Sequence, residues 1–206
     1  DGYRMGNGEI TDSMINDGLW DVYNQIHMGM AGELCSTECS FSREKQDEYA
    51  IESYKRAIEA QKNGKFNAEI TSVIIEDKKG NIVFDKDEEP EKVKFDKIST
   101  LKPVFKKDGV ITAANASSIS DGAAALVVSS KEYAEKNNLK PIAKIIAHNS
   151  FAQSPEWFTT APTAAITKLL NKTGLTIADI DLFEINEAFS VVPMHSIREL
   201  AIPREK

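Results

Sequence analysis

Apolar positions recur at helical spacing over residues 43–62, which predicts the longest helix of the chain. Ile51, Tyr54 and Ile58 fall on one face, and charged residues that include Asp47 occupy the opposite face. Ser42 stands at the N-cap position, and Asn-Gly follows the helix as a stop signal. We therefore expect an amphipathic helix whose charged face, Asp47 included, is solvated.

Shorter helices are predicted where capping residues precede an apolar pattern. The capping-box spacing of Ser129 and Glu132 indicates one of these starts, and Gly174 is a typical helix stop. The predicted short helices are 12–18 after Thr11, a helix that runs through Cys39, 130–137, 163–173, and one that opens after Asn186–Ser190.

Short apolar runs between these helices predict strands. Residues 69–76 and 82–84 flank a Lys-Lys-Gly-Asn turn and form a predicted hairpin. The other runs are a short buried strand at 110–114, another short buried element at 123–128, and strands at 141–151 and 181–185. Runs this short do not by themselves distinguish a strand from a buried helix. The last third alternates strand and helix, which indicates a parallel layered α/β unit separate from the first hundred residues.

Composition narrows the class of protein. The 206 residues are 41% hydrophobic and 28% charged, as in a soluble globular protein. A formal net charge of -7 argues against a general nucleic-acid binder, and no apolar run approaches the length of a membrane span. Two cysteines provide no disulfide framework, which favours a reducing intracellular setting.

Small residues dominate the loop between the apolar runs at 110–114 and 123–128, so a ligand could lie against its backbone. An ordinary strand connection is the alternative interpretation. Gly29 and Gly32 offer similar close approach to a ligand beside His27.

Cys35, Cys39 and His27 raise the question of a zinc site, but structural zinc sites need four ligands and favour shorter cysteine spacings. We interpret both cysteines as half-buried thiols, and no neighbouring base supports a nucleophile. Asn186 follows a predicted strand, where its amide could hold a water or donate to a developing oxyanion. A helix cap followed by an acidic first turn is the equal alternative.

A set of motifs resembles the thiolase family, and within it the biosynthetic acetyl-CoA acetyltransferases. The motifs occur in the family's order and at about its spacings. They are Gly18-Leu-Trp-Asp21, His27-Met-Gly-Met30, Phe41-Ser-Arg-Glu-Lys-Gln-Asp47, Thr112-Ala-Ala-Asn-Ala-Ser117, Asp121-Gly-Ala-Ala-Ala125 and Asn186-Glu-Ala-Phe189. The resemblance covers essentially the whole chain but only the middle of a thiolase.

The resemblance implies an α/β, five-layer αβαβα fold. Residues 1–118 would form most of the loop domain that covers the coenzyme A channel. Residues 119–140 would end the N-terminal core domain, and 141–206 would begin the C-terminal one.

The resemblance also implies a set of site residues. Asn186 would hold the water of the first oxyanion hole, and Glu187 would brace its loop. The residues that would contact coenzyme A or line the pantetheine path are His27, Met28, Phe105, Ala113, Ala116 and Ser117. No metal and no cofactor are implied, because coenzyme A is a substrate or product.

The implied activity is the condensation of two acetyl-CoA to acetoacetyl-CoA and CoA, or the reverse thiolysis. The acyl-accepting cysteine would lie before Asp1, and a Gly-His-Pro histidine and a second cysteine after Lys206, so residues 1–206 alone should be inactive. A non-catalytic, sterol-carrier-type relative that only binds acyl-CoA is the alternative.

The resemblance further implies lipid metabolism, a homodimer or homotetramer, and a cytoplasmic or mitochondrial location without nucleic-acid or membrane partners. Ser118, in place of the usual glycine, and Pro193, which should interrupt a helix, depart from the family pattern.

Overall fold

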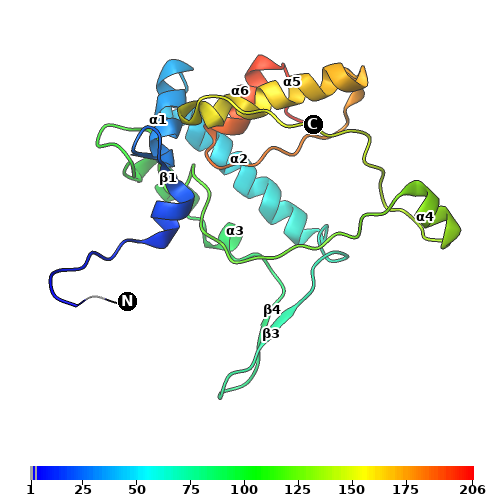
Figure 1. Cartoon of the computed structure of the whole chain (residues 1–206), viewed down its shortest axis with the longest axis horizontal. Helices are drawn as coiled ribbons and strands as arrows, with labels where there is room; N and C mark the ends of the chain where they lie inside the picture. The colour runs from blue at the N-terminus through cyan, green and yellow to red at the C-terminus, as the bar shows by residue number, and fades with distance from the viewer. Residues whose placement is uncertain (1, 3) are drawn as a thin grey trace.

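The computed structural model describes residue 2 and residues 4–206, so residues 1 and 3 of the predicted 1–118 domain lie outside the described residues. Most of the helices gather into one body, whereas the helix Lys131–Lys136 stands apart between extended segments (Figure 1). The helices are α1 (Met28–Glu38), α2 (Arg43–Lys62), α3 (Glu89–Lys92), α4 (Lys131–Lys136), α5 (Ala161–Thr173) and α6 (Val191–Glu199). Single-turn or irregular helical segments are Met14–Leu19, Phe95–Thr100, Pro155–Thr160 and Ile177–Asp179.

Two antiparallel ladders are present among the described residues. Strand β1 (Trp20–Asp21) pairs with β2 (Ile26–His27), with Trp20 opposite His27. Strand β3 (Val73–Ile75) pairs with β4 (Ile82–Phe84), which confirms the predicted hairpin. This second hairpin projects away from the helical body (Figure 1), and both of its strands are exposed.

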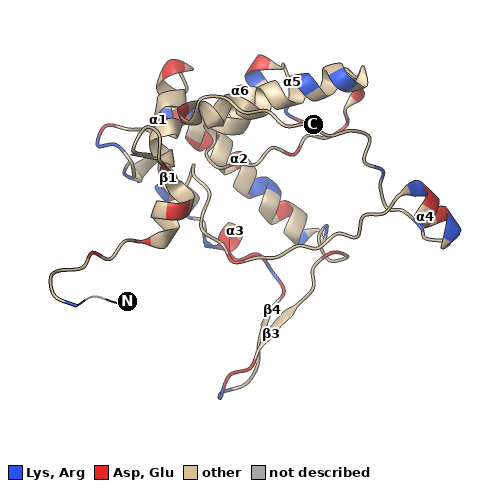
Figure 2. Cartoon of the chain, viewed as in Figure 1, with Lys and Arg blue, Asp and Glu red and all other residues tan. Residues whose placement is uncertain are grey.

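Helix α2 has the predicted bounds, and its start is set by the capping residue Ser42 directly before it. The Ser42 hydroxyl accepts a hydrogen bond from the backbone N–H of Lys45 at 3.3 Å. The buried positions of α2 are nevertheless Gln46, Asp47 and Ala50 rather than the predicted apolar face. The prediction that Asp47 is solvated was therefore wrong, while positive and negative residues are interspersed elsewhere along α2 (Figure 2).

Helix ends follow the sequence closely, with two corrections. Gly174 ends α5 in the left-handed region at φ 71°, as predicted. The cap of α4 is Ser130 rather than Ser129, since the Ser130 hydroxyl accepts from the Tyr133 N–H at 3.1 Å. Pro193 lies in the first turn of α6, where a backbone N–H has no intrahelical partner, so the expected interruption does not occur.

The strands predicted at 110–114, 141–151 and 181–185, and the short buried element predicted at 123–128, are not paired into ladders among the described residues. They run as connecting segments between the helices (Figure 1). The 123–128 run, predicted to be buried, is exposed, with Val127 99% accessible. An apolar run becomes a strand only beside a partner that supplies a series of hydrogen bonds. Within residues 2 and 4–206, the runs at 110–114 and 181–185 have isolated backbone bonds instead, from the Val104 N–H to the Ile111 carbonyl and from the Phe183 N–H to the Lys206 carbonyl.

The core lies where α1, α6 and three connecting segments meet. Its buried residues are Cys35, Phe41, Ile111, Phe189, Val191 and Val192. Burial raises the pKa of the Cys35 thiol to about 12, because the thiolate loses hydration there. Within the described part of the chain, no helix is long and apolar enough to cross a membrane.

Candidate functional site

Two loops distant in sequence lie side by side. We call them the 112–117 loop and the 186–190 loop. Ala116 and Phe189 form an antiparallel bridge, the Ser117 N–H donates to the Ala188 carbonyl at 3.0 Å, and the Ser190 N–H donates to the Asn115 carbonyl at 2.9 Å. The Ser117 hydroxyl adds a 2.6 Å bond to the Glu187 carbonyl. The two loops are therefore fixed to each other by backbone geometry.

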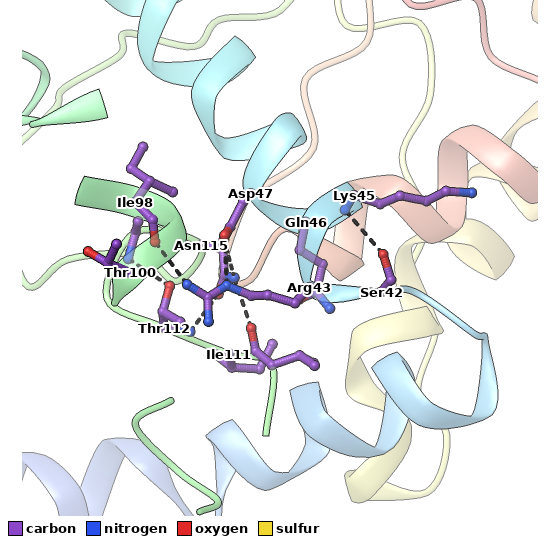
Figure 3. Close-up of polar contacts among 12 residues, drawn as sticks. Ser42, Arg43, Lys45, Gln46, Asp47, Ile98, Thr100, Ile111, Thr112 and Asn115 are labelled. Atoms are coloured by element: carbon purple, nitrogen blue, oxygen red, sulfur yellow. Dashed lines mark hydrogen bonds and ion pairs between the residues drawn. The ribbon is translucent and has the colours of Figure 1, made fainter. Parts of the chain in front are cut away.

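Asn115 fixes the 112–117 loop to helix α2. Its carboxamide oxygen accepts from the Thr112 N–H at 2.8 Å, and its nitrogen donates to the Val110 carbonyl at 3.0 Å and to Asp47 Oδ1 at 3.2 Å. The residue is only 3% exposed. Figure 3 shows Asn115 between the α2 side chains and residues 111–112. The buried amide thus uses both N–H donors and one acceptor position of its oxygen to shape the loop.

Asp47 is balanced by Arg43 one helical turn earlier. Arg43 Nε donates to Asp47 Oδ2 at 2.7 Å, and Arg43 Nη2 donates to the Ile98 carbonyl at 2.8 Å (Figure 3). Each carboxylate oxygen of Asp47 therefore has a donor, which makes its burial tolerable. Asp47, on the face of α2 that we predicted to be solvated, thus holds the 112–117 loop through Asn115.

Glu187 connects the 186–190 loop to α2. Tyr49 Oη donates to Glu187 Oε1 and Ser53 Oγ donates to Glu187 Oε2, both at 2.6 Å. Burial is the main cause that raises the pKa of the Tyr49 phenol, and its hydrogen bond to Glu187 adds to the shift.

Asn186, the predicted oxyanion-hole residue, is exposed at the start of the 186–190 loop. Its side chain makes no hydrogen bond to any of the residues that the structure describes, so the amide is free to meet a ligand or water. Helix α6 begins at Val191 with Ser190 at the N-cap position and no acidic residue in its first turn. The alternative interpretation of Asn186-Glu187 as a helix cap with an acidic first turn was therefore wrong.

His27 is oriented by the start of α1. Its Nδ1 accepts from the Gly29 N–H at 3.0 Å, so in the neutral ring the proton lies on Nε2. The imidazole stacks on Phe105 with ring centroids 4.7 Å apart, and Phe105 meets Phe189 edge-on at 6.0 Å. An aromatic series thus links His27 to the 186–190 loop.

The glycines of α1 admit these rings rather than a ligand. A Cβ added to Gly29 would lie 2.3 Å from the Phe105 ring, and one added to Gly32 would lie 3.2 Å from Phe189. The expectation that both glycines leave room for a ligand was wrong, because aromatic side chains of the same chain fill that space.

The predicted site residues are thus partly brought together. Ser117 bonds to the Glu187 carbonyl, and Ala116 bridges to Phe189 of the same loop. Phe105 reaches that loop through its ring contact with Phe189, and His27 stacks on Phe105. Met28 begins α1 half-buried, and Ala113 is exposed on the 112–117 loop.

A cavity of about 330 Å³ lies between α2, α3 and the two loops. Ser117, Glu187, Ala116 and Ser53 line it, but His27, Met28 and Phe105 do not. Of the predicted coenzyme-contacting residues, Ala116 and Ser117 therefore line this cavity, and His27, Met28 and Phe105 lie outside it.

Sequence reasoning missed Tyr49 and Ser53 as parts of this arrangement, and it included Asn115 only as a member of the Thr112–Ser117 motif. The four-residue spacing of Tyr49 and Ser53, which places two hydroxyls on one helix face, was the available signal. The two cysteines are free thiols, Cys35 being buried and Cys39 half-buried.

Comparison with known proteins finds two family models that together match nearly all of the chain. Residues 1–132 match the family model of the thiolase N-terminal domain, and residues 139–206 match that of the thiolase C-terminal domain. A probable acetyl-CoA acetyltransferase from Dictyostelium discoideum is 45% identical, covering 100% of this chain and 50% of that protein. An acetyl-CoA acetyltransferase from Yarrowia lipolytica is 47% identical over 100% of this chain and 52% of its own length. The chain spans about half the length of these relatives.

Solved structures show the same likeness in three dimensions. An acetyl-CoA acetyltransferase from Bacillus anthracis superimposes with a TM-score of 0.93 at 37% identity, covering 100% of this chain and 52% of that one. A thiolase from Ascaris suum, solved in complex with coenzyme A, superimposes with a TM-score of 0.92 at 40% identity, covering 98% and 52%. The chain therefore belongs to the thiolase family and has the α/β fold of that family over the part it spans.

Proposed function

We propose that the protein carrying this sequence is a coenzyme-A-dependent acyltransferase that condenses two acetyl-CoA to acetoacetyl-CoA and CoA, or catalyses the reverse thiolysis. One observation carries the proposal: the 112–117 and 186–190 loops are fixed together and leave the Asn186 amide free at their edge. The names of the relatives and the coenzyme A complex of the Ascaris suum thiolase support it.

Asn186 has the chemistry that an enolate or tetrahedral oxygen requires. A fixed amide that holds a water stabilises negative charge as it develops on that oxygen. Cys35 is a poor acyl carrier because burial raises its pKa to about 12, which leaves almost no thiolate at neutral pH. We therefore assign the acyl-accepting cysteine and the base to the part of the thiolase length that this sequence does not span. The 206 residues alone should then be inactive.

The proposed coenzyme path passes His27, Met28 and Phe105 and continues along the 112–117 loop. His27 presents Nε2–H as a donor, because Nδ1 is engaged by the Gly29 N–H. The Ser117 hydroxyl already donates to the Glu187 carbonyl, so it offers pantetheine a lone pair rather than a proton.

Some apolar segments of this chain are exposed, as expected if further parts of the protein pack against them. In the apolar run 123–128, Leu126 is 92% and Val127 99% exposed. Neighbouring apolar side chains exposed to this extent usually mark a surface that another part of a protein covers. We propose that further strands of the layered fold cover this face in the complete protein and that the protein is a homo-oligomer.

The test compares variants of the complete protein in thiolysis of acetoacetyl-CoA by CoA. Loss of an oxyanion-hole donor lowers kcat by about 10²–10³-fold, and we expect Asn186→Ala to do so with little change in KM. Asn171→Ala, at an exposed position of α5, is the matched control. Equal kcat for the Asn186 variant and wild type would refute the role. Coenzyme A binding without turnover by wild type would favour the non-catalytic alternative.

A further inference from the structure

Two side chains of α2, Tyr49 and Ser53, hold Glu187, the residue next to Asn186. Neither has been assigned above to coenzyme binding or to the oxyanion. We propose that Tyr49 and Ser53 are positioning residues that act through Glu187 to fix the Asn186 amide toward the reacting oxygen. The inference rests on the proposed function, in which Asn186 serves the oxyanion.

Glu187 is held from two directions. Both carboxylate oxygens accept hydroxyl bonds of 2.6 Å, one from Tyr49 and one from Ser53, so the carboxylate cannot rotate without breaking a bond. The Glu187 carbonyl accepts a third bond, also 2.6 Å, from the Ser117 hydroxyl. Side chain and main chain of this residue are thus both fixed, and Asn186 is joined directly to it. Bonds to a charged acceptor are stronger than those between neutral groups.

The donors are themselves fixed. Tyr49 and Ser53 lie four residues apart on α2, so both face the 186–190 loop. The Arg204 guanidinium lies over the Tyr49 ring at 4.7 Å from its centroid, and Arg204 pairs with Glu52 of the same helix. Tyr49 therefore has little freedom to follow a displaced loop.

A purely structural role of the bonds from Tyr49 and Ser53 to Glu187 predicts a different effect of their removal on kcat. If these bonds only stabilise the fold, their removal lowers the free energy of unfolding while kcat of the folded enzyme stays constant. A positioning role lowers kcat, because a misplaced donor costs transition-state stabilisation, and leaves KM nearly unchanged. The split between kcat and KM therefore separates the two roles.

The experiment uses Tyr49→Phe, Ser53→Ala and the double variant in the complete protein. We expect kcat of thiolysis to fall about 10-fold for each single change, and by more than either single change, up to about 100-fold, for the double. KM should stay within about twofold of wild type. Ser53→Thr retains the hydroxyl and should restore most of the activity lost in Ser53→Ala. The control is Tyr54→Phe, which removes the same atom from the same helix without a hydrogen bond to Glu187.

A second readout does not depend on turnover. Exchange of the backbone amides in residues 187–190 should become faster in the double variant and stay at the wild-type rate in Tyr54→Phe. If wild type turns over no acyl-CoA, the proposed function fails while exchange still decides whether Tyr49 and Ser53 fix the loop. Unchanged exchange, a kcat of the double variant within about twofold of wild type, or a loss confined to KM would overturn the positioning role.

Discussion

Removal of the Asn115 side chain should destabilise the protein more than any other single amide deletion in the site. Asn115→Ala deletes the bonds to Thr112, Val110 and Asp47 in a residue that is 3% exposed. It leaves the N–H of Thr112, which is fully buried, without an acceptor. Asp47 keeps only its bond from Arg43 on the other carboxylate oxygen.

The magnitude follows from these groups. Each lost hydrogen bond costs ~0.5–1.5 kcal/mol net, and a buried donor left unpaired costs ~1–3 kcal/mol. Because the bonds share one side chain, their costs do not simply add, and we expect a loss of about 2–4 kcal/mol in the free energy of unfolding. Urea unfolding of the purified protein measures it, with Asn171→Ala as the control for an exposed amide.

Asn115→Asp sharpens the test. The new carboxylate keeps the acceptor for Thr112 but faces Asp47 Oδ1, to which the native amide donates at 3.2 Å. Like charges raise the pKa of the new group in the folded state, so its contribution to stability is present at acid pH and lost as pH rises through that pKa. Unfolding free energies for Asn115→Ala within about 0.5 kcal/mol of wild type would refute the reasoning.

Further predictions follow from packing and titration. Gly29→Ala should cost about 1–3 kcal/mol, since its Cβ would meet Phe105 at 2.3 Å, whereas Gly18→Ala, with nothing within 4 Å, should be nearly neutral; thermal unfolding compares them. Cys35 should resist iodoacetamide at pH 8 in the native protein and react once it is unfolded, as judged by peptide mass mapping, and rapid native labelling would contradict its burial. Burial lowers the pKa of His195 in the folded state, so the unfolded chain takes up the proton first and stability falls as pH drops below the ordinary value of 6.5. Urea unfolding at pH 7.5 and 5 should show this loss reduced in His195→Gln, and an equal pH dependence would contradict it.

Local features of the fold could be predicted from the sequence. The bounds of α2 follow from Ser42 and the apolar spacing after it, and the β3–β4 hairpin follows from two β-rich runs around a tight turn. The end of α5 at Gly174 is equally local. Such elements depend on residues within a few positions of one another, which a linear pattern records.

Contacts between distant segments could not be predicted in this way. Asp47 and Asn115 are 68 residues apart, and Tyr49 and Glu187 are 138 apart. On a helix whose outer face is charged, a buried Asp47 has the same local pattern as a solvated one. The motifs indicated that the 112–117 and 186–190 loops matter, but their mutual bridge and their attachment to α2 emerge only from the structure.

The short buried element predicted at 123–128 illustrates the same limit of a pattern read from one segment. The 123–128 run has the apolar pattern of a buried strand, yet it is exposed because burial depends on what lies beside it. A strand is a property of a pair of segments, whereas the pattern describes one segment only.

The central claim is that the two joined loops present Asn186 to the reacting thioester of an acyl-CoA. A crystal structure of the complete protein with bound acetyl-CoA tests it most directly. We expect pantetheine along His27, Phe105 and Ser117, with the thioester oxygen linked to the Asn186 amide directly or through one water. A thioester bound elsewhere, with Asn186 facing bulk solvent, would contradict it.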